Sequence, residues 1–288
     1  MRGIFLCNTY TMRLHFPSQV LERNQPCIMG ILNLTPDSFS DGGLFTNTSI
    51  ALKHVQQMIE DGADIIDIGG ESTRPGASDV SVDEECQRVI PVIKAIREVS
   101  AIPISIDTSK TEVMQQAIQA GASMINDVNA LRAEGAVELV AELNVPVCLM
   151  HMQGLPRSMQ HNPSYKDVVQ EINDFLKERI ESCVKAGIKL CNIVIDPGFG
   201  FGKTLEHNLT LFKHLQEFQR LGVPLLVGVS RKSMIGAVLS NTAADERLSG
   251  SIALATLAAW MNTNILRVHD VKATSDALKL CQAVKNAQ

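Results

Sequence analysis

The sequence has few aromatic residues, no excess of positive charge and no apolar run of membrane-spanning length. Only 4% of its 288 residues are aromatic, and 26 basic against 31 acidic residues leave a formal net charge of -5. A slightly acidic chain presents no broad electropositive surface, which argues against nucleic acid and anionic membranes as main partners. The apolar run at 4–7 is too short for the core of a signal peptide.

The chain also lacks any C-x-x-C pair. Its seven cysteines are odd in number and scattered, at positions 7, 27, 86, 148, 183, 191 and 281. This usage argues against a disulfide framework, a zinc cluster or a redox motif, and it favours a reducing compartment. We therefore expect a cytoplasmic protein whose cysteines are mostly small core or helix-face residues.

What the sequence does contain is a repeated alternation of a short β-branched run, a turn and a longer segment of helical period. With 45% apolar and 20% charged residues the composition is globular, and no low-complexity segment or linker divides the chain. Near-continuous apolar runs are typical of parallel strands that are buried on both faces. Eight such runs are present, at 27–33, 64–69, 102–107, 123–128, 145–150, 192–196, 224–229 and 264–268.

Segments of helical period follow these runs. In 82–98 the apolar residues recur at intervals that place them on one helix face. The pairs Ser81/Glu84 and Ser109/Glu112 have the spacing of a capping box. Eight strands alternating with eight helices predict a single (β/α)8 TIM barrel over 26–288, and the alternative is an open doubly wound sheet. Residues 1–25 are expected to form an N-terminal extension, a short strand or hairpin that closes the barrel bottom.

Polar residues stand at the ends of all eight predicted strands. Each of them alone would more often be a satisfied structural residue or a helix cap. In a barrel, however, the chemistry lies at the carboxyl ends of the strands, so eight polar strand ends together predict a polar cup of mixed charge. The residues at these positions are Asn33, Asp67, Asp107, Asn126, Asp127, His151, Asp196, Ser230, Arg231, Lys232, Arg267 and His269.

Two long loops follow the first two strands, at 33–43 and 69–76. Both are rich in Gly, Ser, Thr and Pro, and such loops can donate backbone N–H and hydroxyl bonds to an anion. Arg74 adds a planar cation that suits phosphate, although a plain solvated turn is an equally good interpretation of either loop alone. Each loop is therefore interpreted either as a phosphate-binding loop or as a solvated turn.

The stretch after the sixth strand, 196–204, ends in Gly-Lys-Thr like a Walker A loop. That motif requires a glycine where this chain has Pro197, and the carboxylate of Asp196 would repel phosphate. We therefore reject a nucleotide P-loop. The run is better explained as a tight turn beside a flat ligand, against which Phe199 or Phe201 could pack.

Several of these segments together resemble the dihydropteroate synthase family. The resemblance covers the chain from about Cys27 onward and is carried by the segments GILNLTPDSFSDGG (30–43), GGESTRPGA (69–77), DPGFGFGK (196–203), SRKS (230–233) and RVH (267–269). It implies a folate-pathway transferase that joins 4-aminobenzoate to 6-hydroxymethyl-7,8-dihydropterin pyrophosphate and releases pyrophosphate with Mg²⁺. Members of the family are typically barrel homodimers and targets of sulfonamides.

The resemblance also assigns roles to the strand-end residues. Asp107, Asn126, Asp196 and Lys232 would bind the pterin, with Asp107, Asp196 and Lys232 as the catalytic residues. A carboxylate suits the exocyclic amine and neighbouring ring N–H of a pterin, which are two parallel donors. The other implied ligands are Thr73, Arg74, Arg267 and His269 for pyrophosphate, Thr73, Pro75, Phe201 and Ser233 for 4-aminobenzoate, and Asn33 for Mg²⁺.

Three other functions remain open from the sequence. A pterin-binding methyltransferase domain, which hands a methyl group to a corrinoid, shares the pterin-contacting residues but has no use for Arg267 and His269. A Schiff-base aldolase would use Lys232, although such a lysine normally lies within a strand. A non-catalytic pterin-binding barrel would bind the ring without turnover.

Overall fold

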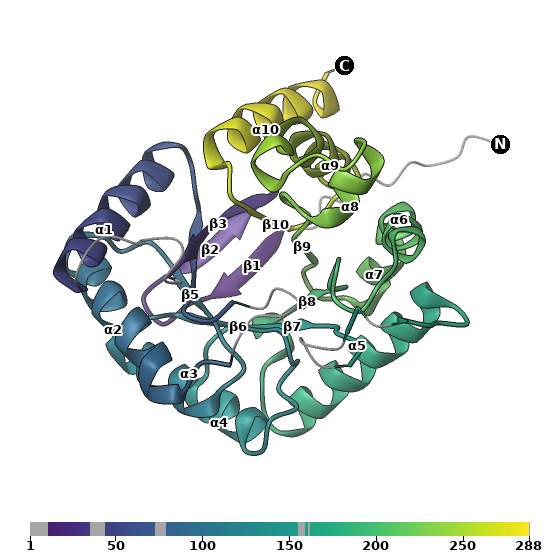
Figure 1. Ribbon diagram of the computed structural model, residues 1–288. Helices are drawn as coiled ribbons and strands as arrows, with labels where there is room; N and C mark the ends of the chain where they lie inside the picture. The colour runs from purple at the N-terminus through teal and green to yellow at the C-terminus, as the bar shows by residue number, and fades with distance from the viewer. Residues whose placement is uncertain (1–10, 35–43, 73–78, 155–158, 161, 288) are drawn as a thin grey trace.

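The computed structural model describes residues 11–34, 44–72, 79–154, 159–160 and 162–287. Its centre is a parallel sheet in the order β8-β7-β6-β5-β4-β3-β10-β9 (Figure 1). The strands are β3 (Cys27–Asn33), β4 (Ile65–Gly69), β5 (Ile104–Asp107), β6 (Met124–Asp127), β7 (Val147–Met150), β8 (Ile193–Asp196), β9 (Leu226–Val227) and β10 (Ile265–Val268). A parallel bridge between Ile195 and Leu225 joins the two sheet edges, so the sheet closes almost completely into a barrel.

The predicted barrel is thus confirmed, and the open doubly wound sheet is wrong. The strands are buried on both faces, as their continuous apolar runs predict. The expected strand at 224–229 is shortened to two residues. Pro224 has no N–H to donate to a neighbouring strand, and Gly228 has no side chain to pack, so both residues weaken pairing at its ends.

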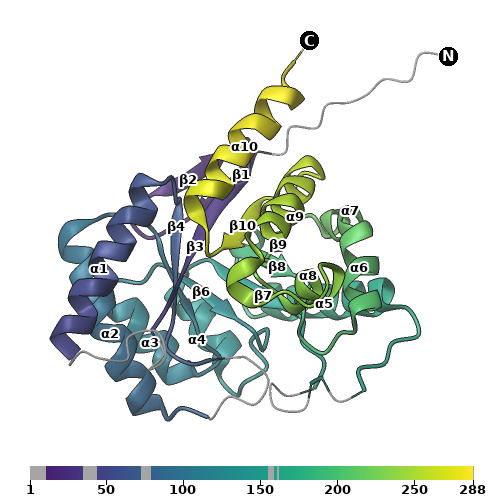
Figure 2. The same ribbon diagram turned by 45° about the horizontal axis from the view of Figure 1, so that its top comes forward.

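Helices surround the barrel on its outer side (Figures 1 and 2). The apolar face of α2 packs inward, with Val89, Ile93 and Ile96 buried, as the periodicity of 82–98 predicts. The helices are α1 (Leu44–Glu60), α2 (Val82–Val99), α3 (Thr111–Ala120), α4 (Ala136–Leu143), α5 (Val168–Lys185), α6 (Leu205–Lys213), α7 (Leu215–Phe218), α8 (Ser233–Val238), α9 (Leu248–Trp260) and α10 (Val271–Lys285). None of the described helices is long and apolar enough to cross a membrane.

The two predicted helix caps have different outcomes. The Ser81 hydroxyl accepts a hydrogen bond of 3.2 Å from the N–H of Glu84, which confirms Ser81 as the N-cap of α2. The prediction for Ser109 is wrong, because α3 begins after Lys110, which forms no side-chain cap. The side chain of Lys110 instead contacts two carboxylates on neighbouring elements.

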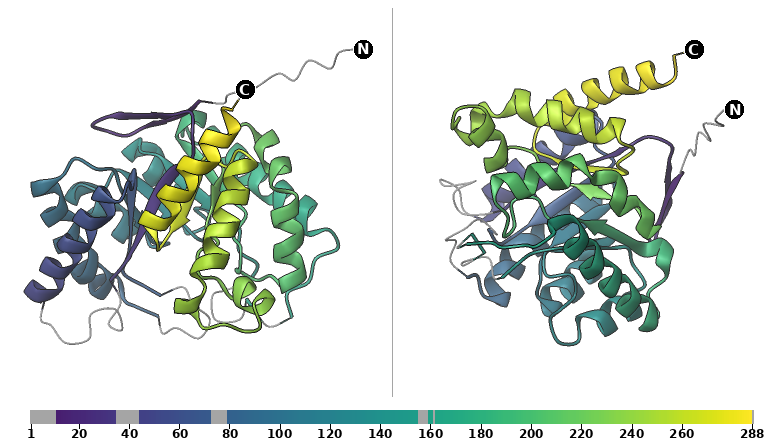
Figure 3. Two further views of the ribbon diagram at one scale, coloured as in Figure 1. Left: turned by 90° about the horizontal axis from the view of Figure 1, so that it is seen from above. Right: turned by 90° about the vertical axis from the view of Figure 1, so that its right-hand side faces the viewer.

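An N-terminal hairpin lies across one end of the barrel (Figure 3). It pairs β1 (Met12–His15) with β2 (Val20–Arg23) in antiparallel register. Its apolar side chains form a cluster with residues from the amino-terminal halves of the strands, including Leu14, Met29, Ile65 and Ile265. The hairpin therefore covers the end of the barrel opposite the strand carboxyl ends.

Candidate active site

The sheet register brings predicted site residues to one level at the carboxyl ends of the strands. Asn33 pairs with Gly69, Gly69 with Asp107, and Asp107 with Asn126. A methyl group at Gly69 would be in ordinary van der Waals contact with Asn33 Oδ1 at 3.6 Å and with Asp107 Oδ2 at 3.8 Å. These two oxygens therefore flank the same backbone position.

Arg267 forms ion pairs with two acids near the carboxyl ends of the strands. Its Nε donates to Asp67 Oδ2 at 2.6 Å, and one Nη donates to Asp107 Oδ2 at 2.7 Å. Asn126 Nδ2 donates to the same Asp67 oxygen at 3.2 Å. Burial alone would lower the pKa of Arg267, but the carboxylates of Asp67 and Asp107 outweigh it and raise that pKa. The guanidinium therefore stays charged, and it fixes the two acids relative to each other.

Asp107 and Asp127 lie in different surroundings although both end a strand. Burial raises the pKa of Asp107 to about 7, against the opposing effect of Arg267. Burial also raises the pKa of Asp127 to about 6, but Asp127 accepts the N–H groups of Asn129 and Leu131, both at 2.7 Å. Strand alternation thus directs Asn126 to the open carboxyl end of the barrel, which we call the mouth. Asp127 points the other way and fixes the turn that follows β6.

The opposite side of the mouth carries Asp196 and Lys232. Asp196 Oδ1 accepts the N–H of Gly198 at 2.7 Å. A methyl group at Gly228 would lie 3.8 Å from both Asp196 Oδ2 and Arg267 Cβ, so Asp196 and Arg267 flank this glycine. Burial raises the pKa of Asp196, whereas the charge of Lys232 lowers it. Burial lowers the pKa of Lys232 to about 8, against the effect of Asp196.

The glycine-rich turn after β8 presents one of its two phenylalanines to the mouth. Phe199 is fully buried and packs on Phe212 with ring centroids 5.9 Å apart, so of the two phenylalanines Phe201 remains the candidate for packing on a ligand. The Phe201 ring is half-buried and its centroid lies 4.5 Å from Lys232 Nζ. Lys232 Nζ also donates to the Phe199 carbonyl.

A buried lysine ends this turn, and from sequence it had no role beyond its place in the rejected P-loop and in the segment 196–203. Lys203 Nζ donates to the carbonyls of Gly198 at 2.8 Å and Phe201 at 2.9 Å, and it lies 3.0 Å from His151 Nδ1. Burial and the charge of Lys203 lower the pKa of His151 to about 2, so its ring is neutral and accepts. Lys203 therefore shapes the turn that carries Phe201.

Of the remaining predicted residues, the structure describes His269 and Ser233. His269 contacts Ser230 Oγ through its backbone N–H at 3.2 Å and through Nδ1 at 3.0 Å. Ser233 is exposed at the start of α8, directly after Lys232. Thr73, Arg74 and Pro75 lie outside the described residues.

A barrel with acids, an amide and basic residues at its carboxyl ends matches a known class of protein. The family model described as pterin binding enzyme matches residues 29–269. The chain is 52% identical to the dihydropteroate synthase of Escherichia coli K12 over 277 residues, which cover 96% of this chain and 98% of that protein. It is 52% identical to the enzyme of Haemophilus influenzae over 276 residues, covering 96% and 100%.

Solved structures agree with these relatives. A Yersinia pestis dihydropteroate synthase in complex with a sulfonamide drug has a TM-score of 0.91 at 49% identity, covering 96% of this chain and 100% of that one. The Xanthomonas albilineans enzyme with 4-aminobenzoic acid has a TM-score of 0.91 at 50% identity and the same coverage. The chain belongs to the pterin-binding enzymes and, within them, to the dihydropteroate synthase family.

Proposed function

We propose that this dihydropteroate synthase binds both substrates in the mouth of the barrel, above Gly69 and Gly228. The reaction joins the amine of 4-aminobenzoate to the methylene of 6-hydroxymethyl-7,8-dihydropterin pyrophosphate and gives 7,8-dihydropteroate and pyrophosphate. Structures of the Xanthomonas albilineans relative hold 4-aminobenzoic acid and 7,8-dihydropteroate. The observation that carries the proposal is that Asn33, Asp107, Asp196 and Arg267 converge on these two glycines at the carboxyl ends of the strands.

The pterin ring is assigned to the acids and the amide of the mouth. Asp196 accepts from the exocyclic amine and the adjacent ring N–H, for which a carboxylate offers two matching oxygens. Asn126 adds an amide, and its donation to Asp67 fixes its orientation. Lys232 donates to the ring carbonyl and a ring nitrogen. These contacts hold the reacting methylene group at a fixed place.

The chemical step breaks the bond between the methylene carbon and the pyrophosphate oxygen. A bond from that carbon to the nitrogen of 4-aminobenzoate forms, and the amine releases one proton. Loss of pyrophosphate spreads positive charge over the methylene and the pterin ring, so a fixed carboxylate beside the ring stabilises the transition state. Asp107 supplies this carboxylate, and Arg267 favours its ionised form.

The pyrophosphate is assigned to Arg267 and His269, together with Thr73 and Arg74. Arg267 uses Nε and one Nη on Asp67 and Asp107, so its other Nη is the group assigned to the phosphate oxygens. His269 lies two residues further along the same segment. Mg²⁺ would be held by Asn33, whose neutral Oδ1 flanks Gly69 together with Asp107 Oδ2. Magnesium keeps several waters and takes phosphate oxygens, so a single protein amide would suffice as its anchor. The bound ion would neutralise the charge of the leaving group.

The 4-aminobenzoate is assigned to Phe201 and Ser233, together with Thr73 and Pro75. Phe201 presents a half-buried ring beside Lys232, which gives an apolar wall for a flat aromatic acid. The exposed hydroxyl of Ser233 is available to the carboxylate. A sulfonamide would occupy the same place, as a mimic of the aminobenzoate.

A homodimer is proposed through the outer face of α9. Leu257 is 51% and Trp260 is 53% exposed, and the neighbouring α10 exposes Leu280 and Val284. Apolar side chains grouped on adjacent helices are typical of an interface. Sedimentation at several concentrations tests this, with Trp260→Glu expected to shift the protein toward monomer.

A cytoplasmic location stays a prediction from cysteine usage.

The function is tested by pyrophosphate release from the pterin pyrophosphate with and without 4-aminobenzoate. We expect release to require both substrates and to yield dihydropteroate. Transfer of a methyl group to a corrinoid would support the methyltransferase instead, and pterin binding without turnover would support the non-catalytic barrel. Asp107→Asn is expected to keep the fold and to lower kcat by about 100-fold, because it removes one electrostatic contribution to the transition state.

A further inference from the structure

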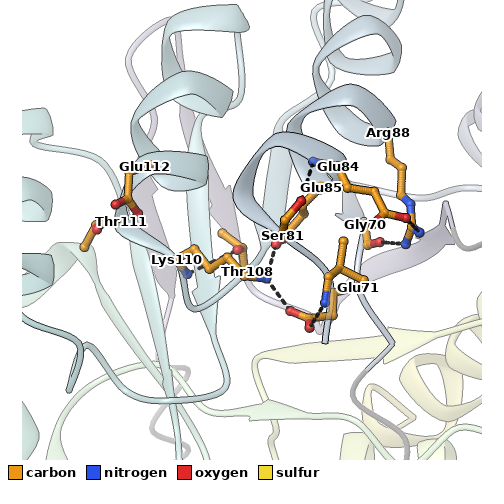
Figure 4. Close-up of polar contacts among 11 residues, drawn as sticks. Gly70, Glu71, Ser81, Glu84, Glu85, Arg88, Thr108, Lys110, Thr111 and Glu112 are labelled. Carbon is orange, nitrogen blue, oxygen red and sulfur yellow. Dashed lines mark hydrogen bonds and ion pairs between the residues drawn. The ribbon is translucent and has the colours of Figure 1, made fainter. Parts of the chain in front are cut away.

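A second charged cluster lies beside the mouth and has no role in the mechanism above. Figure 4 shows it at the junction of α2, α3 and the chain that follows β4. Lys110 Nζ donates to Glu71 Oε2 at 2.5 Å and to Glu85 Oε2 at 2.6 Å. The three side chains differ in burial, since Glu85 is fully buried while Lys110 and Glu71 are about one quarter exposed. A buried carboxylate of this kind requires a cation.

Glu71 uses its two oxygens for two different tasks. While Oε2 contacts Lys110, Oε1 accepts the backbone N–H of Val80 at 3.0 Å. Val80 lies nine residues further along the chain, directly before Ser81, the N-cap of α2. The Glu71 carboxylate therefore joins the two ends of the segment 72–79, and Lys110 fixes that carboxylate from the side of α3.

The chain directly before Glu71 is also held against α2. The Gly70 carbonyl accepts from Arg88 at 2.7 Å. A methyl group at Gly70 would lie 2.8 Å from Val89 Cγ1 and 2.9 Å from Glu85 Cγ, so no larger residue fits this close approach. The backbone before Glu71 is thus set by packing, while the side chain of Glu71 depends on Lys110.

The cluster continues the strand register beyond the sheet. Gly69 of β4 pairs with Asp107 of β5 through the backbone, and two to three residues later Glu71 and Lys110 pair through their side chains. Lys110 thus follows Asp107, the proposed pterin contact, by three positions.

We propose that Lys110 is a positioning residue for the reaction, because through Glu71 it sets the spacing of the two ends of segment 72–79. This inference rests on the proposed function, in which Thr73 and Pro75 contact 4-aminobenzoate. It assigns to Lys110 an effect on the use of 4-aminobenzoate and not on binding of the pterin. Glu85 serves as the buried counter-charge that keeps Lys110 in place.

The test uses the double variant Lys110→Met with Glu85→Gln. Replacing Lys110 alone would leave the Glu85 charge buried without its cation and would risk the fold, whereas the glutamine removes that charge. Arg23→Met is the matched control, since Arg23 donates to Asp64 at 2.8 Å at the other end of the barrel. Lys110→Arg is the conservative variant. Each protein is assayed for steady-state kinetics, for pterin affinity by calorimetry and for hydrogen exchange at the Val80 amide.

We expect kcat/KM for 4-aminobenzoate to fall by about 100-fold in the double variant, because small misplacements of binding groups have effects of this size. Pterin affinity should be unchanged, the Val80 amide should exchange faster, and Lys110→Arg should restore most of the loss. The Arg23→Met control should keep wild-type kinetics. Equal losses for the pterin and for 4-aminobenzoate would overturn the proposal, as would unchanged kinetics.

The two proposals fail in different ways. If the wild-type protein did not consume 4-aminobenzoate, the proposed function would fail, yet Val80 exchange would still report whether Lys110 fixes Glu71. If the wild type turned over normally while Val80 stayed protected in the double variant, the role of Lys110 would be refuted and the function would stand.

Discussion

The two ends of the barrel are built from the same strands and have opposite chemistry. On β10, Ile265 packs into the apolar cluster with the N-terminal hairpin, and two residues later Arg267 contacts two carboxylates. On β3, Met29 belongs to the apolar cluster, and Asn33 ends the strand at the mouth. Short strands therefore separate a stabilising end from a reactive end by only two to four residues.

This separation explains how the mouth tolerates its buried charges. Asp67, Asp107 and Arg267 place two acids and one guanidinium together, and burying such groups costs free energy that their attraction does not fully return. The apolar end contributes stability through burial without such cost. Substitutions at the two ends should therefore separate stability from function.

The largest expected effect is Leu14→Ala in the hairpin. Leu14 is fully buried in the apolar cluster, so the variant should lose about 3 kcal/mol of unfolding free energy. Below its unfolding temperature the variant should keep wild-type kcat/KM. Urea unfolding and steady-state kinetics test both statements, and a large loss of kcat/KM in the folded variant would mean that the two ends are coupled.

Arg267→Ala and His269→Ala should act on the pyrophosphate substrate. Loss of a charged hydrogen-bond donor should weaken binding of the pterin pyrophosphate by about 2 kcal/mol. A pterin without phosphates should lose much less affinity in His269→Ala. Arg267→Ala should also weaken this pterin, because it leaves Asp67 and Asp107 without their cation. The ratio of the two affinities is the measurement, and equal losses in His269→Ala would assign His269 to the ring or to the fold.

Lys232 predicts a pH dependence of binding. Its pKa is lowered to about 8, so the donor is charged below pH 8 and becomes neutral above it. Pterin affinity should fall as the pH rises through about 8, and Lys232→Arg should remove this fall. The free energy of unfolding should rise between about pH 8 and pH 10. In this range the folded chain has lost the proton, whereas the unfolded chain holds it up to a pKa of about 10.4. An unchanged affinity profile in Lys232→Arg would exclude Lys232 as its source.

The smallest expected effect is Ser81→Ala at the N-cap of α2. Loss of the hydrogen bond to the Glu84 N–H should lower unfolding free energy by about 1 kcal/mol. The comparison is Ser109→Ala, for which we expect no loss of this kind, since Ser109 does not cap α3. Thermal unfolding of both variants tests the difference.

The sequence predicts the strands well because parallel strands are buried on both faces and read as apolar runs. It predicts β3 at 27–33 to the residue, and it misses the length of β9, where Pro224 and Gly228 weaken pairing. The strand-end polar residues also follow from sequence, since the barrel rule places them at one mouth. Helix caps are less secure, as Ser109 shows, because a shift of one residue changes the capping side chain.

Side-chain partners distant in sequence could not be predicted. Arg267 contacts Asp67 across 200 positions, and no local pattern encodes this pair. The contact of Lys110 with Glu71 and Glu85 depends on the packing of α2 against α3. The only sequence signal for Lys203 is a lysine directly after a glycine-rich turn, whose inward carbonyls become visible in the fold.

Calorimetric titration of a pterin analogue into wild-type protein and Asp196→Asn tests most directly the claim that the mouth binds the pterin. Asn offers an NH₂ group where the ring presents donors, so affinity should fall by about 2 to 3 kcal/mol, while thermal unfolding stays near that of the wild type. Unchanged affinity in a folded Asp196→Asn variant would contradict the account and remove Asp196 from the site.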